Sequence, residues 1–216
     1  MQVEIGAAAA QVQADIYQMV RKAEQAGLVR LSAGNISARL GDGQAAITPS
    51  GIKYDRLRVE EISIVSLEGA TLYGPRPSSE TPMHTALYRA FPWVQAVVHT
   101  HSPYAMTFAV LGKEIPAISL ETLRVGAPVP VAEWACPGTA AAGERVVAWL
   151  RSRPELRVVL LRSHGLLAVG RSLEEAFEFA YDAEVGAQIY YQALQVGEPL
   201  VLDAAQVAEI HAVYGG

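Results

Sequence analysis

The segment VQAVVHTHSP, residues 94–103, joins a β-rich apolar run to the start of a helix and carries two histidines at the junction. Side chains two positions apart on a strand point to the same face of a sheet. His99 and His101 are therefore expected to project together, about 7 Å apart along the backbone. Two such imidazoles can both reach one metal ion. The plain alternative is a half-buried strand whose polar face carries two histidines, and the pair alone leaves both interpretations open.

A third histidine, His164, lies in the segment RVVLLRSHGLLAVG, residues 157–170, which is typical of two apolar strands around a tight turn. Gly165 permits a sharp bend there, which would aim the imidazole of His164 out of the sheet. An isolated histidine at such a place is usually only a turn residue. Three neutral imidazoles around an open fourth position, however, form a common catalytic zinc site, so the three histidines together favour a metal centre.

Composition narrows the class of protein. The chain has 216 residues, with Lys+Arg 17 against Asp+Glu 22 and a formal net charge of -5. The acidic balance and the absence of a Lys/Arg cluster argue against nucleic acid or an anionic membrane as partner. Only 18% of the residues are charged, which indicates that other subunits cover part of the surface. The length predicts a single domain over residues 1–216.

Localisation is predicted to be cytoplasmic. The single cysteine, Cys136, excludes an internal disulfide framework and fits a reducing compartment. The first twenty residues lack a basic region, and Glu4 and Asp15 interrupt their apolar character, so we expect no signal peptide. No run of 18 apolar residues is present, so we expect no membrane span.

Away from the histidines, apolar periodicity alternates with turn signals. The patterns predict helices over residues 8–26, 81–90, 102–112, 139–152 and 172–195, and a short one after Asp203. They predict strands within residues 28–57, a hairpin over 62–74, and further strands over 94–101, 114–119, 128–134 and 157–170. Strict β–α–β alternation is missing and hairpins recur, which favours an α/β fold with one mostly antiparallel sheet covered by helices.

The segment PSSETPMH, residues 77–84, places hydroxyls and a carboxylate at the entry of a helix. Hydroxyls and free backbone N–H groups of Ser78 and Ser79 can hold an anion there. The turns GNIS (34–37) and TPSG (48–51) can add amides, although any one of these turns alone is more often an ordinary cap. Glu80 is either an acid favoured by the helix dipole or, beside a metal and an anion, a general base.

Two histidines remain. His84 follows Glu80 by four residues, so it is either a second metal residue or a helix residue that orients a neighbour; Pro82 favours the second interpretation. His211 has no partner in sequence and is expected to be solvated.

Taken in order, AGNISARL, ITPSGI, RPSSETPMH, VVHTHSP, IPAIS and SHGLLAVG resemble the class II aldolase/adducin family, from about residue 15 to the C-terminus. The resemblance implies a three-layer α/β/α domain around a mostly antiparallel sheet. It also implies a fourfold homotetramer with active sites between subunits. By motif, zinc would be bound by His99, His101 and His164, Glu80 would be the acid/base that can also bind zinc, and the phosphate-binding set would be Asn35, Ser50, Gly51, Ser78 and Ser79.

The activity implied by the resemblance is cleavage of a ketose 1-phosphate of the L-fuculose 1-phosphate type. The products would be dihydroxyacetone phosphate and a small aldehyde such as lactaldehyde. Zinc would stabilise the enediolate charge. A lysine aldolase is disfavoured because Lys22, Lys53 and Lys113 lie in no evident apolar pocket.

One departure from the family pattern concerns the acid that protonates the leaving aldehyde. A tyrosine is expected shortly after IPAI, where this chain has Ser119 and Leu120. Leucine cannot donate a proton, so Glu121 and Tyr214 become the candidates, with Tyr214 acting from a neighbouring subunit.

The scaffold of this family also hosts pentulose-phosphate 4-epimerases, sugar-phosphate dehydratases and decarboxylases, and the adducin head uses it without catalysis. A (β/α)₈ metal hydrolase is disfavoured because such barrels usually need ~250 residues.

Overall fold

In the computed structural model, which describes residues 6–41 and 43–214, one eight-stranded sheet runs through the molecule in the order β4-β3-β2-β1-β5-β8-β7-β6. Every neighbouring pair is antiparallel except β6 and β7, which are parallel, so the predicted antiparallel character is confirmed. The strands are β1 (Asn35–Leu40), β2 (Gln44–Ile47), β3 (Ser63–Ser66), β4 (Thr71–Tyr73), β5 (Ala96–Thr100), β6 (Val131–Ala132), β7 (Val158–Leu161) and β8 (Gly165–Gly170).

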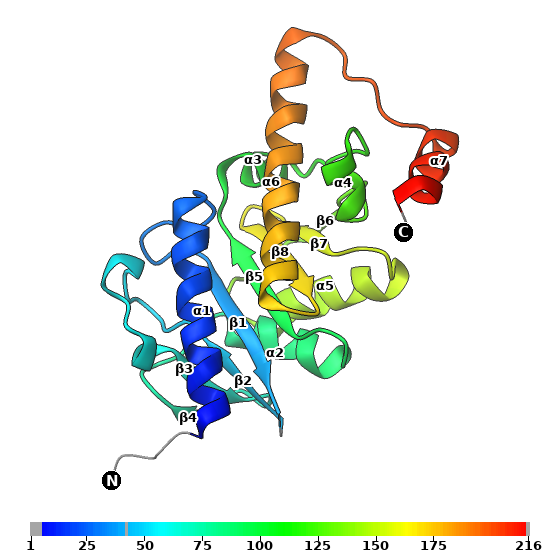
Figure 1. Ribbon diagram of the computed structural model, residues 1–216. Helices are drawn as coiled ribbons and strands as arrows, with labels where there is room; N and C mark the ends of the chain where they lie inside the picture. Colours follow the sequence, from blue (N-terminus) through cyan, green and yellow to red (C-terminus); the bar gives the residue numbers. More distant parts are fainter. Residues whose placement is uncertain (1–5, 42, 215–216) are drawn as a thin grey trace.

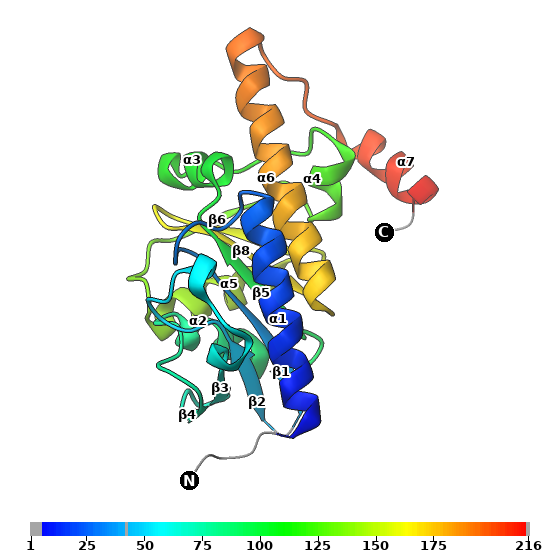
Figure 2. The ribbon, with the colours of Figure 1, turned by 60° about the vertical axis from the view of Figure 1, so that its left-hand side comes forward.

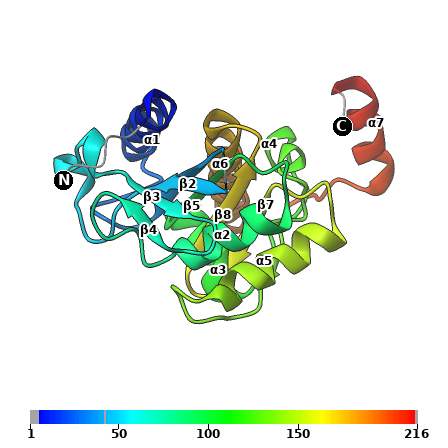
Figure 3. The same cartoon turned by 90° about the horizontal axis from the view of Figure 1, so that it is seen from below.

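Helices cover both faces of the sheet, as Figure 3 shows from below. The helices are α1 (Ala7–Gln25), α2 (Thr81–Ala90), α3 (Pro103–Leu111), α4 (Leu120–Arg124), α5 (Ala140–Ser152), α6 (Leu173–Val196) and α7 (Ala204–Tyr214), with 3-10 turns η1 (Tyr54–Arg56) and η2 (Val59–Glu61). Helices α1, α3 and α6 pack on one face, whereas α2 and α5 pack on the other. The predicted three-layer α/β/α arrangement is therefore confirmed.

Alternation along the strands separates two apolar cores. On β7, Val158 and Leu160 join the core under α1, α3 and α6, whereas Val159 and Leu161 join the core under α2 and α5. Fully buried strands of this kind read as continuous apolar runs because both faces are covered. On β5 the same alternation sends Val97 and His99 toward α2 and α5, which is the face on which the candidate site forms.

Two predicted strands are largely absent. Over residues 114–119 only Ile115 pairs, in an isolated bridge to Val129, and the predicted strand over 128–134 is reduced to β6. Pro116, Pro128 and Pro130 explain this, because proline has no N–H to donate to a ladder. The short helix α4 was not predicted, and it begins where Ser119 accepts a hydrogen bond from the backbone of Thr122.

The C-terminal end of α6 and the helix α7 extend away from the three layers (Figures 1 and 2). Helix α7 buries none of its residues, and the backbone of Leu202 just before it donates a hydrogen bond to Ala117 at 2.8 Å. We call residues 196–214 the C-terminal arm. Within residues 6–41 and 43–214, no helix combines the length and the apolar character that crossing a membrane requires.

Candidate metal centre

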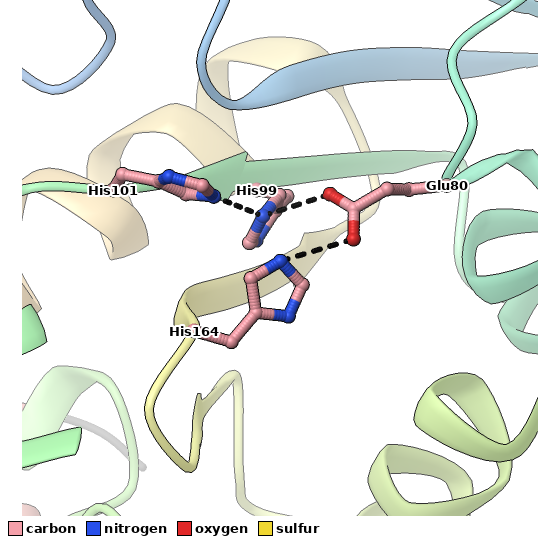
Figure 4. A group of neighbouring side chains, drawn as sticks. All are labelled: Glu80, His99, His101 and His164. Carbon is pink, nitrogen blue, oxygen red and sulfur yellow. Dashed lines mark hydrogen bonds and ion pairs between the residues drawn. The ribbon is translucent and has the colours of Figure 1, made fainter. Parts of the chain in front are cut away.

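Glu80, His99, His101 and His164 converge at one end of the sheet, although 84 positions separate the first from the last. One possible ligand atom from each residue lies within 4.8 Å of all the others. Figure 4 shows the four side chains pointing toward one another from three segments, with His99 and His101 at the end of one strand. Residue types and spacing predicted a metal centre of the three histidines, and the family resemblance implied that Glu80 joins them.

The two histidines of the H-x-H pair point to the same place, as strand geometry predicts. His99 is the penultimate residue of β5, and His101 follows the end of the strand two residues before α3. Their Nε2 atoms lie 3.0 Å apart. The ring of His99 is fully buried, whereas His101 is exposed, so His101 faces the side from which a ligand can enter.

His164 reaches the cluster through the turn between β7 and β8. The bend expected at Gly165 lies two residues earlier, at Ser163, which adopts the left-handed conformation with φ 56. Gly165 is required for a different reason. A Cβ atom there would lie 2.3 Å from the Thr100 carbonyl oxygen and 3.0 Å from Cε1 of His99. Glycine thus lets the β8 backbone pass directly beneath the histidines.

Glu80 is the residue that precedes the first turn of α2, and its carboxylate turns inward toward the histidines. Its Oε2 atom lies 2.9 Å from Nε2 of His99, and its Oε1 atom lies 3.0 Å from Nε2 of His164. The Oε1 atom is buried and accepts no hydrogen bond of good geometry from the residues that the structure describes. A buried oxygen without a donor is costly unless a ligand satisfies it.

The donor set fits a divalent metal. Nδ1 of His99 lies 2.9 Å from the carbonyl oxygen of Leu166, an acceptor, so in the neutral ring Nδ1 carries the proton and Nε2 presents a lone pair. That lone pair faces Nε2 of His101 and the carboxylate of Glu80. A single proton can be shared by only two of these acceptor atoms, whereas a single metal cation can be bound by all of them. Three imidazole nitrogens with one carboxylate oxygen are ligands typical of zinc.

Ionisation in the cluster also suits a cation. Burial alone would raise the pKa of Glu80, but the adjacent imidazoles of His164 and His99 hold this pKa far below its usual range. Burial, and then the neighbouring His99, lowers the pKa of His101 to about 4. Near neutral pH the cluster therefore presents an ionised carboxylate and a neutral His101, which are the forms that bind metal.

Four of the five predicted phosphate-binding residues come from two segments that the fold brings together. Pro49 and Pro77 form an antiparallel bridge, and the N–H of Ser50 donates to the carbonyl of Arg76 at 2.9 Å. Ser50, Gly51, Ser78 and Ser79 therefore lie on adjoining turns near Glu80. The Ser78 hydroxyl accepts a hydrogen bond from the N–H of Glu80 at 3.2 Å, whereas Ser79 is exposed.

Asn35 belongs to the candidate centre in a way that the sequence did not indicate. Its side-chain nitrogen donates to Oε2 of Glu80 at 2.9 Å, and its side-chain oxygen lies 2.6 Å from Nε2 of His84. Both ends of the amide are therefore engaged inside the protein. His84 is buried and lies outside the group of possible metal ligands in the described residues, and His211 is exposed.

The two candidates for the acid lie elsewhere. Tyr214 is 71% exposed at the end of the C-terminal arm, which both ribbon views place away from the sheet. Glu121 is in the first turn of α4, where a hydrogen bond from the Ser119 side chain lowers its pKa. Neither residue belongs to the group of possible metal ligands in the described part of the chain.

Comparison with known proteins identifies the family. Residues 14–191 match the class II aldolase and adducin N-terminal domain. A 5-deoxy-D-ribulose 1-phosphate aldolase of Bacillus thuringiensis serovar kurstaki is 37% identical over 91% of this chain and 92% of its own. The L-fuculose phosphate aldolase of Escherichia coli K12 is 36% identical over 85% of each chain.

The fold agrees with this assignment. A solved structure of an L-fuculose 1-phosphate aldolase superposes with a TM-score of 0.88 at 30% identity, and the match covers 95% of this chain and 97% of the other. The chain belongs to the class II aldolase and adducin family, whose aldolases are metal-dependent enzymes acting on sugar phosphates.

Proposed function

We propose that this protein is a zinc-dependent aldolase that cleaves a ketose 1-phosphate of the L-fuculose 1-phosphate type to dihydroxyacetone phosphate and a small aldehyde. The observation that carries the proposal is the convergence of three imidazoles on a buried carboxylate whose Oε1 lacks a donor among the residues described. A non-catalytic module has no use for such a costly arrangement. The exposed thiol of Cys136 fits action in the reducing cytoplasm.

In this proposal His99, His101 and His164 bind the zinc ion, and Glu80 completes the group. A bound zinc ion supplies a Lewis acid that stabilises negative charge developing on substrate oxygens. The hydroxyls and amides of the two bridged turns hold the phosphate. They come from Ser50, Gly51, Ser78 and Ser79, and the turns need no lysine to do so.

Proton transfer is assigned to Glu80. Cleavage breaks the C3–C4 bond of the ketose, the C4 hydroxyl loses its proton as C4 becomes the aldehyde, and C3 must gain a proton to give dihydroxyacetone phosphate. In the condensation direction the Glu80 carboxylate removes the C3 proton; in the cleavage direction Glu80 first takes up a proton, which the loss from the C4 hydroxyl balances, and delivers it to C3. Its lowered pKa means that the resting group is ionised, so it is prepared for the condensation direction.

The group that serves the C4 oxygen comes, in this proposal, from a neighbouring chain of a homotetramer. The C-terminal arm is exposed in the single chain and carries Tyr214. Docked on another subunit, the arm would bring a phenol to that subunit's zinc site. Glu121 is the second candidate for this role.

A second candidate substrate is 5-deoxyribulose 1-phosphate, which the name of the 37% identical relative supports. Both substrates release the same phosphorylated fragment, carbons 1 to 3. L-Fuculose 1-phosphate leaves the three-carbon lactaldehyde, whereas 5-deoxyribulose 1-phosphate leaves the two-carbon acetaldehyde. The absence of a tyrosine at Leu120 concerns the aldehyde end of the substrate, which is where the two differ.

The test is a product assay on the purified, zinc-loaded protein with a panel of ketose and pentulose 1-phosphates, with and without a chelator. Dihydroxyacetone phosphate should appear with at least one substrate and disappear when the metal is removed. The accompanying aldehyde identifies the substrate class. An epimerised pentulose phosphate, a dehydrated product or carbon dioxide in place of a cleaved aldehyde would overturn the proposal.

A further inference from the structure

Behind the candidate metal centre, five buried polar side chains form one continuous chain of hydrogen bonds. The Tyr88 hydroxyl lies 2.6 Å from Oγ of Ser37, and this oxygen lies 2.7 Å from Nδ1 of His84. Nε2 of His84 lies 2.6 Å from Oδ1 of Asn35, and Nδ2 of Asn35 donates to Oε2 of Glu80 at 2.9 Å. All five side chains are buried.

The ionised carboxylate of Glu80, at the end of this hydrogen-bonded chain, determines which atom carries the proton in each of the other groups. An ionised carboxylate can only accept, so Asn35 presents its NH₂ group to Glu80 and its oxygen to His84. His84 must then carry its proton on Nε2, which leaves Nδ1 as an acceptor. Ser37 donates to Nδ1, and its oxygen accepts from the hydroxyl of Tyr88. The chain thus consists of donors that all point toward Glu80.

The chain treats the two oxygens of the Glu80 carboxylate differently. Oε2 receives the Asn35 donor, whereas Oε1 accepts none of good geometry from the described residues. We propose that His84 and Asn35 are positioning residues, which hold Glu80 by Oε2 and so fix the orientation in which its carboxylate faces the metal and the substrate. This inference rests on the proposed function of Glu80.

A neutral donor suits this position better than a cation does. A lysine or arginine beside Oε2 would repel the metal ion. Burial, and then the charge of His99, lowers the pKa of His84 to about 3, so the imidazole stays uncharged near neutral pH. The chain therefore supplies a directed hydrogen bond to the carboxylate without adding a charge.

Folding alone does not require these polar groups. His84 and Tyr88 sit on α2 beside Met83 and Leu87 in the core under α2 and α5. Replacing both partners of a buried hydrogen bond by apolar groups of the same shape is often nearly neutral for stability. The polar chain instead specifies one orientation of one carboxylate, which is the usual effect of a hydrogen-bonded partner behind a metal ligand.

The test is a double-mutant cycle that measures the dissociation constant for Zn²⁺ by chelator competition in wild type, His84→Phe, Glu80→Ala and the double variant. His84→Phe should weaken binding ~10–100-fold, the range typical of partners behind metal ligands. In the Glu80→Ala background the same substitution should change binding less than about twofold, because the group that it positions is gone. The visible absorption spectrum of the Co²⁺-substituted protein should change in His84→Phe.

Two further variants separate positioning from general loss of structure. His84→Gln keeps a side-chain N–H that can face Asn35 and should bind zinc more tightly than His84→Phe does. If His84→Phe folds poorly, His84→Gln still tests the proposal. Thr85→Val is the matched control. It removes another buried hydroxyl of α2, bonded at 3.3 Å to the carbonyl of Pro82, and should bind zinc as wild type does.

Equal losses of affinity for His84→Phe in both backgrounds would overturn the inference, as would unchanged affinity in Glu80→Ala. Metal affinity is read without substrate. A wild-type protein that binds zinc but cleaves no ketose 1-phosphate would therefore refute the proposed function while the cycle still decides the positioning role.

Discussion

The candidate metal centre and the C-terminal arm contrast in how much one chain determines. In the metal centre, side chains from segments as far apart as residues 35 and 164 come together, and Glu80, His99 and His164 are buried. In the arm, Val196 and Leu200 are 92% and 93% exposed, and Tyr214 is 71% exposed. In the proposed function, the metal-binding half of the site lies within one chain, whereas the half that serves the aldehyde draws on the C-terminal arm of another chain.

The largest effect on this contrast should come from removing one metal residue. His101→Ala should lose most of the zinc and reduce turnover to the uncatalysed background, because two imidazoles and a carboxylate bind zinc less tightly than the full set. Metal analysis of the purified variant measures this. The matched control is His211→Ala in the arm, which should retain its zinc since His211 is exposed. Full zinc occupancy in His101→Ala would exclude His101 from the site.

Glu80→Gln should keep the fold and most of the metal but lose turnover. The amide is nearly the same shape but cannot accept the substrate proton, and general acid–base groups contribute ~10²–10⁴-fold. Steady-state kinetics at saturating zinc measures the drop. Glu209→Gln on α7 replaces an exposed carboxylate and should be silent. A drop of less than about tenfold would move the base elsewhere, with Glu121 the next candidate.

Local spacing predicted that His99 and His101 project together, whereas the place of Glu80 beside the histidines was implied by the family resemblance. A separation of two on a strand aligned His99 with His101, and the helix start at Thr81 placed Glu80 at an end that faces them. The same rules contain a signal for the hydrogen-bonded chain behind Glu80. Asn35 and Ser37 are two apart on β1, and His84 and Tyr88 are four apart on α2. Only the pairing of Asn35 with His99 across β1 and β5 reveals that the two pairs meet.

What the sequence could not predict depends on partners far away in the chain. The apolar pattern of EIPAIS is typical of a strand, yet the prolines on both sides of the Ile115–Val129 bridge stop the ladder. Likewise, Gly165 was expected to form a bend, and its requirement for close approach to Thr100 appears only when β5 and β8 are paired.

Gly165→Ala tests how tightly the metal centre is built. The added Cβ must displace Thr100 or the histidine rings, and overpacking of this kind typically costs ~1–3 kcal/mol of stability. We expect a lower unfolding temperature together with weaker zinc binding, measured by calorimetry and chelator competition. Gly197→Ala, at the start of the arm, is the control because its Cβ would meet nothing within 4 Å. Unchanged zinc affinity in Gly165→Ala would show that the rings tolerate displacement.

Ser79→Ala tests the phosphate-binding turns with a smaller expected effect. The Ser79 hydroxyl makes no hydrogen bond within the described part of the chain, so it is free to donate to a ligand. A hydrogen bond to a charged group contributes ~1.5–3 kcal/mol, which predicts at least a tenfold rise in KM for the phosphorylated ketose. The dephosphorylated ketose should be affected far less. Equal losses for both would indicate a structural turn residue.

The smallest effect should come from the arm itself, and it decides whether the contrast between the two regions has functional meaning. Deleting residues 212–216 removes Tyr214 and leaves the metal residues untouched. We expect normal zinc content and oligomeric state, with turnover reduced by about tenfold, below the ~10²–10⁴-fold of a fully placed general acid, because water can take over part of its role. Preference among aldehydes should relax, since the arm would shield the aldehyde end of the substrate.

The matched variant Tyr214→Phe keeps the aromatic ring and removes only the phenolic hydroxyl, so it should lower turnover while aldehyde preference persists. If both variants have wild-type kinetics for every aldehyde, the arm takes no part in the reaction, and Glu121 or a water molecule exchanges the proton with the C4 oxygen.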